Sequence, residues 1–236
     1  TQTGDYRFLQ GNIIKDSILM SCFDSSHAFL FEGRLFEGTI RGLFYSGSHW
    51  KEPWVSSKNE LFTLENPYAL TNRVKGEKLE FTFPNIEGKN VSYPNKHYQE
   101  KVVIIQILGS WCPNCVDETK FFTALHRQYQ AEGLEIIALA FEAPEKLSDK
   151  ITRVKALKSH LGANYEFLIA GNANKKDAQR VLPFLSEVSS FPTTIFIDKK
   201  GMIRKIHTGF YGPGTGDHYV KYVSEINILV QGLLSE

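Results

Sequence analysis

Residues 101–115 read KVVIIQILGSWCPNC, and this stretch decides the fold. The run of Val and Ile over residues 101–108 predicts a buried strand. Residues 113–129 place Val116, Phe122 and Leu125 on or near one face, which is the period of a helix. Cys112 and Cys115 therefore stand where a buried strand passes into a helix.

This position gives the two cysteines different chemistry. The free N–H groups and the partial positive charge of a helix N-terminus stabilise a thiolate at Cys112. Pro113 fits the first turn, where its missing N–H is not needed. Cys115 follows one turn later, within reach of Cys112. We predict that Cys112 is the attacking thiolate and that Cys115 is the resolving thiol that breaks a mixed disulfide.

A zinc half-site and a structural cysteine pair are the alternatives for this motif. Zinc needs about four ligands, and the sequence has only three cysteines and no second pair. His160 and His207 have no ligand spacing relative to the motif. C-x-x-C at a strand-to-helix switch is a more specific redox signal than the same motif alone.

The chain around the motif alternates between strand and helix patterns. A hairpin is predicted at residues 79–83 and 90–93, further strands at 134–141, 167–170, 193–198 and 202–208, and helices at 146–161, 174–185 and 217–234. This order predicts an α/β domain over residues 76–236 with a central mixed sheet flanked by helices.

The first part of the chain, residues 1–75, is predicted to be a small β-rich accessory module. Strand-like runs occur at residues 28–32 and 43–45, and the start at Tyr6-Arg7-Phe8-Leu9 also resembles a strand. The polar residues 72–78, with Gly76, mark the predicted boundary.

Composition excludes several classes of function. The chain has 236 residues, 42% of them hydrophobic and 22% charged, which is enough apolar side chain for a core. The net charge of +1 predicts no nucleic-acid partner. The apolar run at 102–108 is far shorter than the roughly 20 residues that span a bilayer. The sequence begins at Thr1 without Met, so we expect a processed chain, with membrane association only through an anchor removed from its N-terminus.

Three groups of residues together resemble the thioredoxin superfamily, specifically its TlpA/ResA-like extracytoplasmic branch. They are the run Gly109-Ser110-Trp111-Cys112-Pro113-Asn114-Cys115, then Glu118, and the run Phe191-Pro192-Thr193-Thr194-Ile195-Phe196-Ile197-Asp198. The resemblance covers roughly residues 76–236 and implies a thioredoxin-like (redoxin) fold. Eighty positions separate Cys112 from Pro192, more than in plain thioredoxin, which fits the branch's inserted helix and strand.

The resemblance also implies roles for individual residues. Pro192 should be cis and face the cysteine pair, although an ordinary strand-start proline is the alternative. Phe191 should offer backbone groups to an extended substrate segment. Trp111 and Pro113 should flank the substrate site.

Glu118 and Gln106 are the positions that bear on which residue accepts the proton of the resolving thiol. Thioredoxin has a buried Asp where this chain has Gln106, so a proton acceptor for Cys115 must come from elsewhere. Glu118 matches the acidic residue that the branch carries three positions after its second cysteine, and we predict that it is the acceptor. The alternative is a solvated acid favoured by the helix dipole.

The function implied is an extracytoplasmic, bacterial periplasmic enzyme that exchanges or reduces disulfides in exported proteins, with apocytochrome c thiols as one substrate class. An upstream thiol electron donor would supply it. We expect no metal and no cofactor other than the redox-active Cys112–Cys115 disulfide. Asn114 gives the thiolate less help than the His of the oxidising C-P-H-C motif, which favours a reductase.

Three other functions remain open from the sequence. A peroxiredoxin-like thiol peroxidase shares the fold, but its P-x-x-x-T-x-x-C signature is missing, since Ile105 and Gly109 stand in place of the Pro and the Thr. A Cu(I) carrier would use the soft thiolates, but such carriers usually have C-x-x-x-C spacing and a partner His. A partner-binding module would use the domain only as a scaffold.

Four further residues are weaker candidates. We expect Cys22 to be a buried, inert thiol. Trp50 and Trp54 are predicted to lie in a loop, and His126 to be a solvated helix residue.

Overall fold

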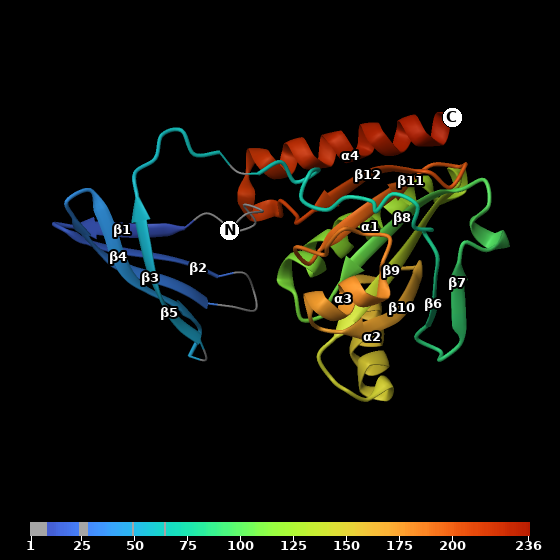
Figure 1. Ribbon diagram of the computed structural model, residues 1–236, viewed down its shortest axis with the longest axis horizontal. Helices are drawn as coiled ribbons and strands as arrows, with labels where there is room; N and C mark the ends of the chain where they lie inside the picture. The colour runs from blue at the N-terminus through green and yellow to red at the C-terminus, as the bar shows by residue number, and fades with distance from the viewer. Residues whose placement is uncertain (1–8, 24–27, 49, 64) are drawn as a thin grey trace. The chain divides into compact units, whose positions relative to one another are not determined.

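The computed structural model describes residues 9–23, 28–48, 50–63 and 65–236 (Figure 1). Of the strand expected at Tyr6-Arg7-Phe8-Leu9, the first three residues lie outside this range. The chain divides into two compact units, Tyr6–Leu64 and Glu65–Glu236.

The larger unit is built on a five-stranded mixed sheet in the order β10-β9-β8-β11-β12. Its strands are β8 (Val102–Leu108), β9 (Leu134–Glu142), β10 (Glu166–Asn172), β11 (Thr193–Ile197) and β12 (Ile203–Thr208). β8, β9 and β10 are parallel, whereas β11 runs antiparallel to both β8 and β12. All seven residues of β8 are buried, because this central strand is covered on both faces.

Four helices flank this sheet (Figure 1). They are α1 (Pro113–Tyr129), α2 (Leu147–Leu161), α3 (Lys175–Val181) and α4 (Asp217–Ser235). α1 and α4 pack together through Phe121 and Tyr222, whose ring centroids lie 5.9 Å apart. The predicted central mixed sheet with flanking helices is confirmed, and α2 with β10 forms the predicted inserted helix and strand. The prediction placed the end of this helix at residue 185, but α3 ends at Val181. The helix stops there because Pro183 has no N–H to continue it.

Short elements complete this unit. β6 (Phe81–Pro84) and β7 (Asn90–Tyr93) form the predicted antiparallel hairpin. Three 3-10 turns lie at Lys96–Tyr98, Gln130–Glu132 and Pro213–Thr215. No helix in the described part of the chain has the length and hydropathy required to span a bilayer.

The units divide about ten residues earlier than the predicted boundary at residues 75 and 76. Residues 65–75 belong to the larger unit because their backbone is hydrogen-bonded to it. The N–H of Val74 donates to the Phe184 carbonyl at 2.8 Å, and the N–H of Thr208 donates to the Pro67 carbonyl at 2.9 Å. The polar composition of residues 72–78 reflects an exposed surface segment and not a linker.

The smaller unit is a sheet of five antiparallel strands in chain order, which confirms a β-rich N-terminal module. The strands are β1 (Gln10–Ile14), β2 (Ser17–Phe23), β3 (Ala28–Phe36), β4 (Thr39–Ser46) and β5 (Trp50–Ser57). The prediction of a loop around Trp50 and Trp54 is wrong, because both lie in β5. Pro53 obscured the strand pattern, but an edge strand tolerates proline. Trp54 packs edge-on against Phe31 with ring centroids 5.8 Å apart.

Candidate active site

Cys112 and Cys115 lie where β8 leads into α1, as predicted. Cys112 is the N-cap of α1, and its sulfur accepts a hydrogen bond from the Cys115 N–H at 3.4 Å. Pro113 occupies the first turn and is half-buried. The side chain of Cys112 is 7% exposed and that of Cys115 is fully buried. An incoming group can therefore reach Cys112 before it reaches Cys115.

The Phe191–Pro192 segment faces Cys112 from the loop before β11. The peptide bond between these residues is cis, as the resemblance implied. The Cys112 thiol donates to the Phe191 carbonyl at 3.5 Å. The Phe191 ring lies between Trp111 and Phe141, at centroid distances of 5.6 and 5.7 Å. Trp111 is 40% exposed, so it gives the site an aromatic rim that solvent can reach.

The loop before Cys112 is held by Glu142, which the sequence analysis did not single out. The Glu142 carboxylate accepts from the Ser110 N–H at 2.7 Å and from the Ser110 hydroxyl at 2.6 Å. Beside it, the Trp111 indole N–H donates to the Phe141 carbonyl at 2.9 Å. Burial raises the pKa of Glu142 against the lowering effect of the Ser110 hydrogen bonds. The C-terminal end of β9 thus fixes the two residues that precede Cys112.

The position of Glu142 in the sequence could have marked it as a candidate site residue. It is the acidic residue that ends the apolar run at 134–141, at the carboxyl edge of a parallel strand, and this edge is where α/β sheets bind ligands. Periodicity alone does not say which neighbouring loop such a residue contacts.

Glu118 is fully buried beneath the cysteines, one helical turn after Cys115. This burial excludes the alternative of a solvated acid. The carboxylate accepts from Gln106 Nε2 at 2.8 Å, Thr194 Oγ1 at 2.9 Å and the Tyr222 hydroxyl at 3.4 Å. Burial raises the pKa of Glu118 to about 8, although the three hydrogen bonds oppose the rise. Glu118 can therefore gain and lose a proton near neutral pH.

Cys115 is the thiol that most needs such a partner. Burial raises its pKa well above the ordinary value, and the neighbouring Cys112 and the charge of Glu118 raise it further. Solvent cannot remove its proton directly because the side chain has no exposed surface.

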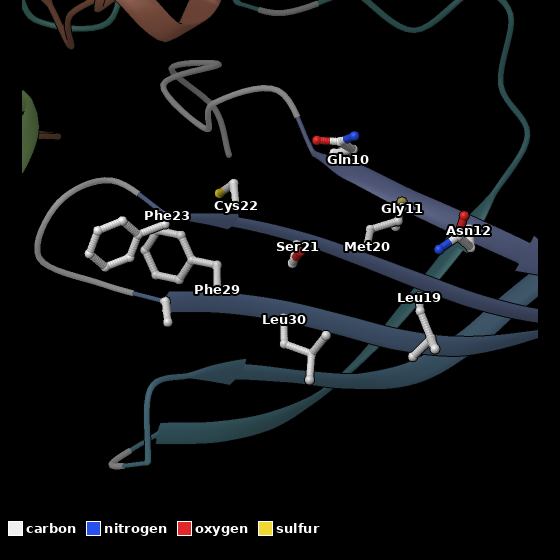
Figure 2. Close-up of a pocket in the computed structure, with 11 residues that line it drawn as sticks. Gln10, Gly11, Asn12, Leu19, Met20, Ser21, Cys22, Phe23, Phe29 and Leu30 are labelled. Carbon is white, nitrogen blue, oxygen red and sulfur yellow. The ribbon is translucent and has the colours of Figure 1, made fainter.

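Cys22 belongs to the smaller unit and is half-buried in β2, so the expectation of a buried thiol is wrong. It lines a pocket of about 680 Å³ on β1, β2 and β3 (Figure 2). Among the described residues that line this pocket, Cys22 has the only thiol. The pocket has no acid or histidine in that set, and we assign it no chemistry.

Comparison with known proteins places the chain in a family. The model of the AhpC/TSA family matches residues 75–206, more than half of the chain. The chain belongs to this family. It is 28% identical over 137 residues to the thiol-disulfide oxidoreductase ResA of Halalkalibacterium halodurans, covering 58% of this chain and 69% of that protein. It is 26% identical over 172 residues to ResA of Bacillus thuringiensis subsp. konkukian, covering 70% and 87%.

Solved structures show the same fold. A secreted thiol-disulfide isomerase from Corynebacterium glutamicum superimposes with a TM-score of 0.54 at 14% identity, over 74% of this chain and 98% of that one. The predicted thioredoxin-like fold is confirmed. Both of these sequence relatives are named thiol-disulfide oxidoreductases.

Proposed function

We propose that the chain is a protein thiol–disulfide oxidoreductase that works through the Cys112/Cys115 couple. One observation carries the proposal. Cys112 lies at a helix N-terminus opposite the cis-Pro192 segment, and the fully buried Cys115 donates its backbone N–H to the Cys112 sulfur. An attacking thiolate needs access and anion stabilisation, whereas a resolving thiol needs only proximity.

The reduction of a substrate disulfide takes two exchanges. The Cys112 thiolate attacks one substrate sulfur, a Cys112–substrate disulfide forms, and the other substrate sulfur leaves as a thiolate that takes up a proton. Cys115 then loses its proton, and its thiolate attacks Cys112. The Cys112–Cys115 disulfide forms, and the second substrate sulfur leaves. The substrate gains two electrons and two protons, and the enzyme dithiol becomes a disulfide.

Glu118 handles the proton of Cys115 in this scheme. Its carboxylate takes the proton when Cys115 attacks, and its carboxyl returns the proton when an upstream thiol donor reduces the enzyme disulfide. A pKa of about 8 leaves both forms populated near neutrality.

The substrate segment should bind along Trp111, Pro113, Phe191 and Pro192. The exposed Trp111 ring offers an apolar contact, and the Phe191 backbone lies beside the Cys112 sulfur, where an extended peptide could pair with it. This arrangement supports protein substrates.

The direction of electron transfer and the cellular location are inferred from the sequence. Asn114 in place of a charge-capable His favours a reductase. The resemblance to the extracytoplasmic TlpA/ResA-like branch favours a periplasmic enzyme with exported proteins as substrates. Apocytochrome c thiols are one such substrate class. The reduction potential of the Cys112/Cys115 couple, measured against glutathione, tests the direction, since a potential near that of oxidising enzymes contradicts a reductase.

Trapping of substrate tests the function itself. Cys115→Ser should accumulate mixed disulfides with protein substrates through Cys112, because the resolving step is lost. Cys112→Ser should trap nothing and should abolish reductase activity. Equal trapping by both variants would contradict the assignment.

A thiol peroxidase is the competing activity, since it shares this fold. A peroxidase threonine would stand at position 109, but a Cβ added to Gly109 would lie 2.3 Å from Trp111 Nε1 and 3.0 Å from the Phe141 carbonyl oxygen. The loop therefore has no room for that side chain. Consumption of hydrogen peroxide at a rate comparable to disulfide reduction would reinstate the peroxidase.

A further inference from the structure

A row of buried polar side chains crosses the sheet. In the sheet register, Thr194 on β11 pairs with Gln106 on β8 on one side and with His207 on β12 on the other. Cross-strand partners point to the same face. The three residues are 0%, 0% and 1% exposed. Burying a polar group in a core costs free energy unless the group is hydrogen-bonded.

Glu118 from α1 and Tyr222 from α4 contact this row. Gln106 and Thr194 donate to Glu118, and the Tyr222 hydroxyl donates to the same carboxylate oxygen as Thr194. The Tyr222 ring packs edge-on against His207 with centroids 4.8 Å apart. The polar row therefore runs without a break from the group beneath Cys115 to His207.

One end of this row borders a surface pocket. Tyr222 and His207 both line a pocket of about 230 Å³, together with Tyr68, His218 and Glu225. His218 is exposed, and Glu225 is half-buried and accepts from the Tyr68 hydroxyl at 3.1 Å. Of the three side chains that donate to Glu118, Tyr222 is the one that borders this pocket.

We propose that Tyr222 connects Glu118 to this pocket and that Glu118 exchanges its proton with solvent there. This inference rests on the proposed role of Glu118. Glu118 gives its proton to the Tyr222 oxygen while the Tyr222 hydroxyl proton passes to solvent in the pocket, and uptake runs in reverse. One O–H bond breaks for each that forms, and no electron moves. Tyr222 is thus a positioning and proton-transferring residue.

Other titratable groups near Glu118 do not offer this route. Cys115 lies on the same helix and is the group that Glu118 serves. Tyr165 directly precedes β10, and the charge of Glu118 raises its pKa, but in the described part of the structure its hydroxyl makes no hydrogen bond to Glu118. His207 binds the Gly209 carbonyl oxygen through Nδ1 at 2.9 Å, and burial lowers its pKa to about 4, so it stays neutral. The positive charge of Lys205, on the same strand, also lowers the pKa of His207.

Tyr222→Phe tests the proposal because it removes the hydroxyl and keeps the ring. The matched control is Tyr129→Phe, which removes another buried hydroxyl, one that accepts from Gln231 at 2.8 Å and contacts Asn227. The infrared band of the protonated Glu118 carboxyl is identified at pH 6 by its loss in Glu118→Gln. After transfer to D₂O, this band should exchange at least roughly ten-fold more slowly in Tyr222→Phe than in wild type or the control.

Kinetics give a second readout. Tyr222→Phe should slow the resolving step roughly ten-fold in the wild-type background and leave it unchanged in the Glu118→Gln background. The pH midpoint of resolution should also rise, because the Tyr222 hydrogen bond lowers the pKa of Glu118. Wild-type carboxyl exchange and an unmoved midpoint in Tyr222→Phe would overturn the tyrosine path alone. A wild-type resolving rate in Glu118→Gln would instead overturn the role of Glu118 on which the path depends.

Discussion

Glu118→Gln keeps the shape of the side chain and removes its titration, so it isolates the proton-transfer role. The pKa of about 8 means that roughly one Glu118 in ten is a carboxylate at pH 7 and half are at pH 8. The wild-type resolving rate should therefore rise with pH, reach half of its maximum near pH 8 and level off above that pH. The variant should resolve roughly ten- to a thousand-fold more slowly, the typical loss when a general base is removed. The resolving rate of the variant should show no midpoint near pH 8.

The assay separates the two exchanges within one reaction. Reduced protein carrying Cys22→Ala is mixed with 5,5′-dithiobis(2-nitrobenzoate) in a stopped-flow instrument. Attack by Cys112 releases the first coloured thiolate, and resolution by Cys115 releases the second. Glu118→Gln should leave the first phase intact and slow the second. Cys115→Ser should show the first phase alone.

Asp117→Asn is the matched control, since it removes a carboxylate from the neighbouring position of α1. Asp117 pairs with the exposed Lys120 at 3.2 Å. It should keep both phases. A Glu118→Gln protein that resolves at the wild-type rate from pH 6 to 8 would refute the reasoning.

Three further predictions follow from burial and hydrogen bonding. Iodoacetamide should label Cys112 before Cys115 in the reduced protein, because the side chains are 7% and 0% exposed; peptide mapping that finds Cys115 first would contradict the assignment. Folding raises the pKa of Glu118 from 4.5 to about 8, so its contribution to stability is full below pH 4.5 and is lost as the pH rises through 8. Between pH 5 and 8, denaturant unfolding should therefore show the stability of Glu118→Gln rising relative to wild type by up to roughly 4 kcal/mol. A constant difference in unfolding free energy would count against the raised pKa. Glu142→Gln should destabilise the fold by about 1–3 kcal/mol, because the two carboxylate oxygens that accept the Ser110 hydrogen bonds are replaced by one oxygen and an NH₂ group. The same variant should slow the first exchange phase. An unchanged melting curve and an unchanged first phase would show that this contact is dispensable.

The local elements of the larger unit were predictable from the sequence. The apolar run of β8 and the period of α1 are strong signals, and the second cysteine falls one turn into a helix whichever fold surrounds it. α1 begins and ends at the predicted residues, Pro113 and Tyr129. The cis Phe191–Pro192 bond came from the family resemblance, since a strand-start proline has the same local pattern.

Contacts between distant segments were not predictable in the same way. Thr194 and Tyr222 are 76 and 104 residues from Glu118, and only the register of β8 against β11 and the packing of α4 bring them together. His126 was expected to be solvated, but it is 4% exposed and its Nδ1 lies 2.9 Å from Asn164 Oδ1. A polar residue can occupy a buried helix face when its partner comes from another element, and periodicity does not show that partner.

The placement of Trp111 has a practical consequence for spectroscopy. Its indole is fixed by the Phe141 carbonyl and is adjacent in sequence to Cys112, so its fluorescence should respond to whether the neighbouring sulfurs are thiols or a disulfide. The sequence has three tryptophans, and the other two, Trp50 and Trp54, lie in the smaller unit. Replacing those two with phenylalanine leaves a single emitter beside the redox pair. The protein then reports its own oxidation state optically, without a dye or a label.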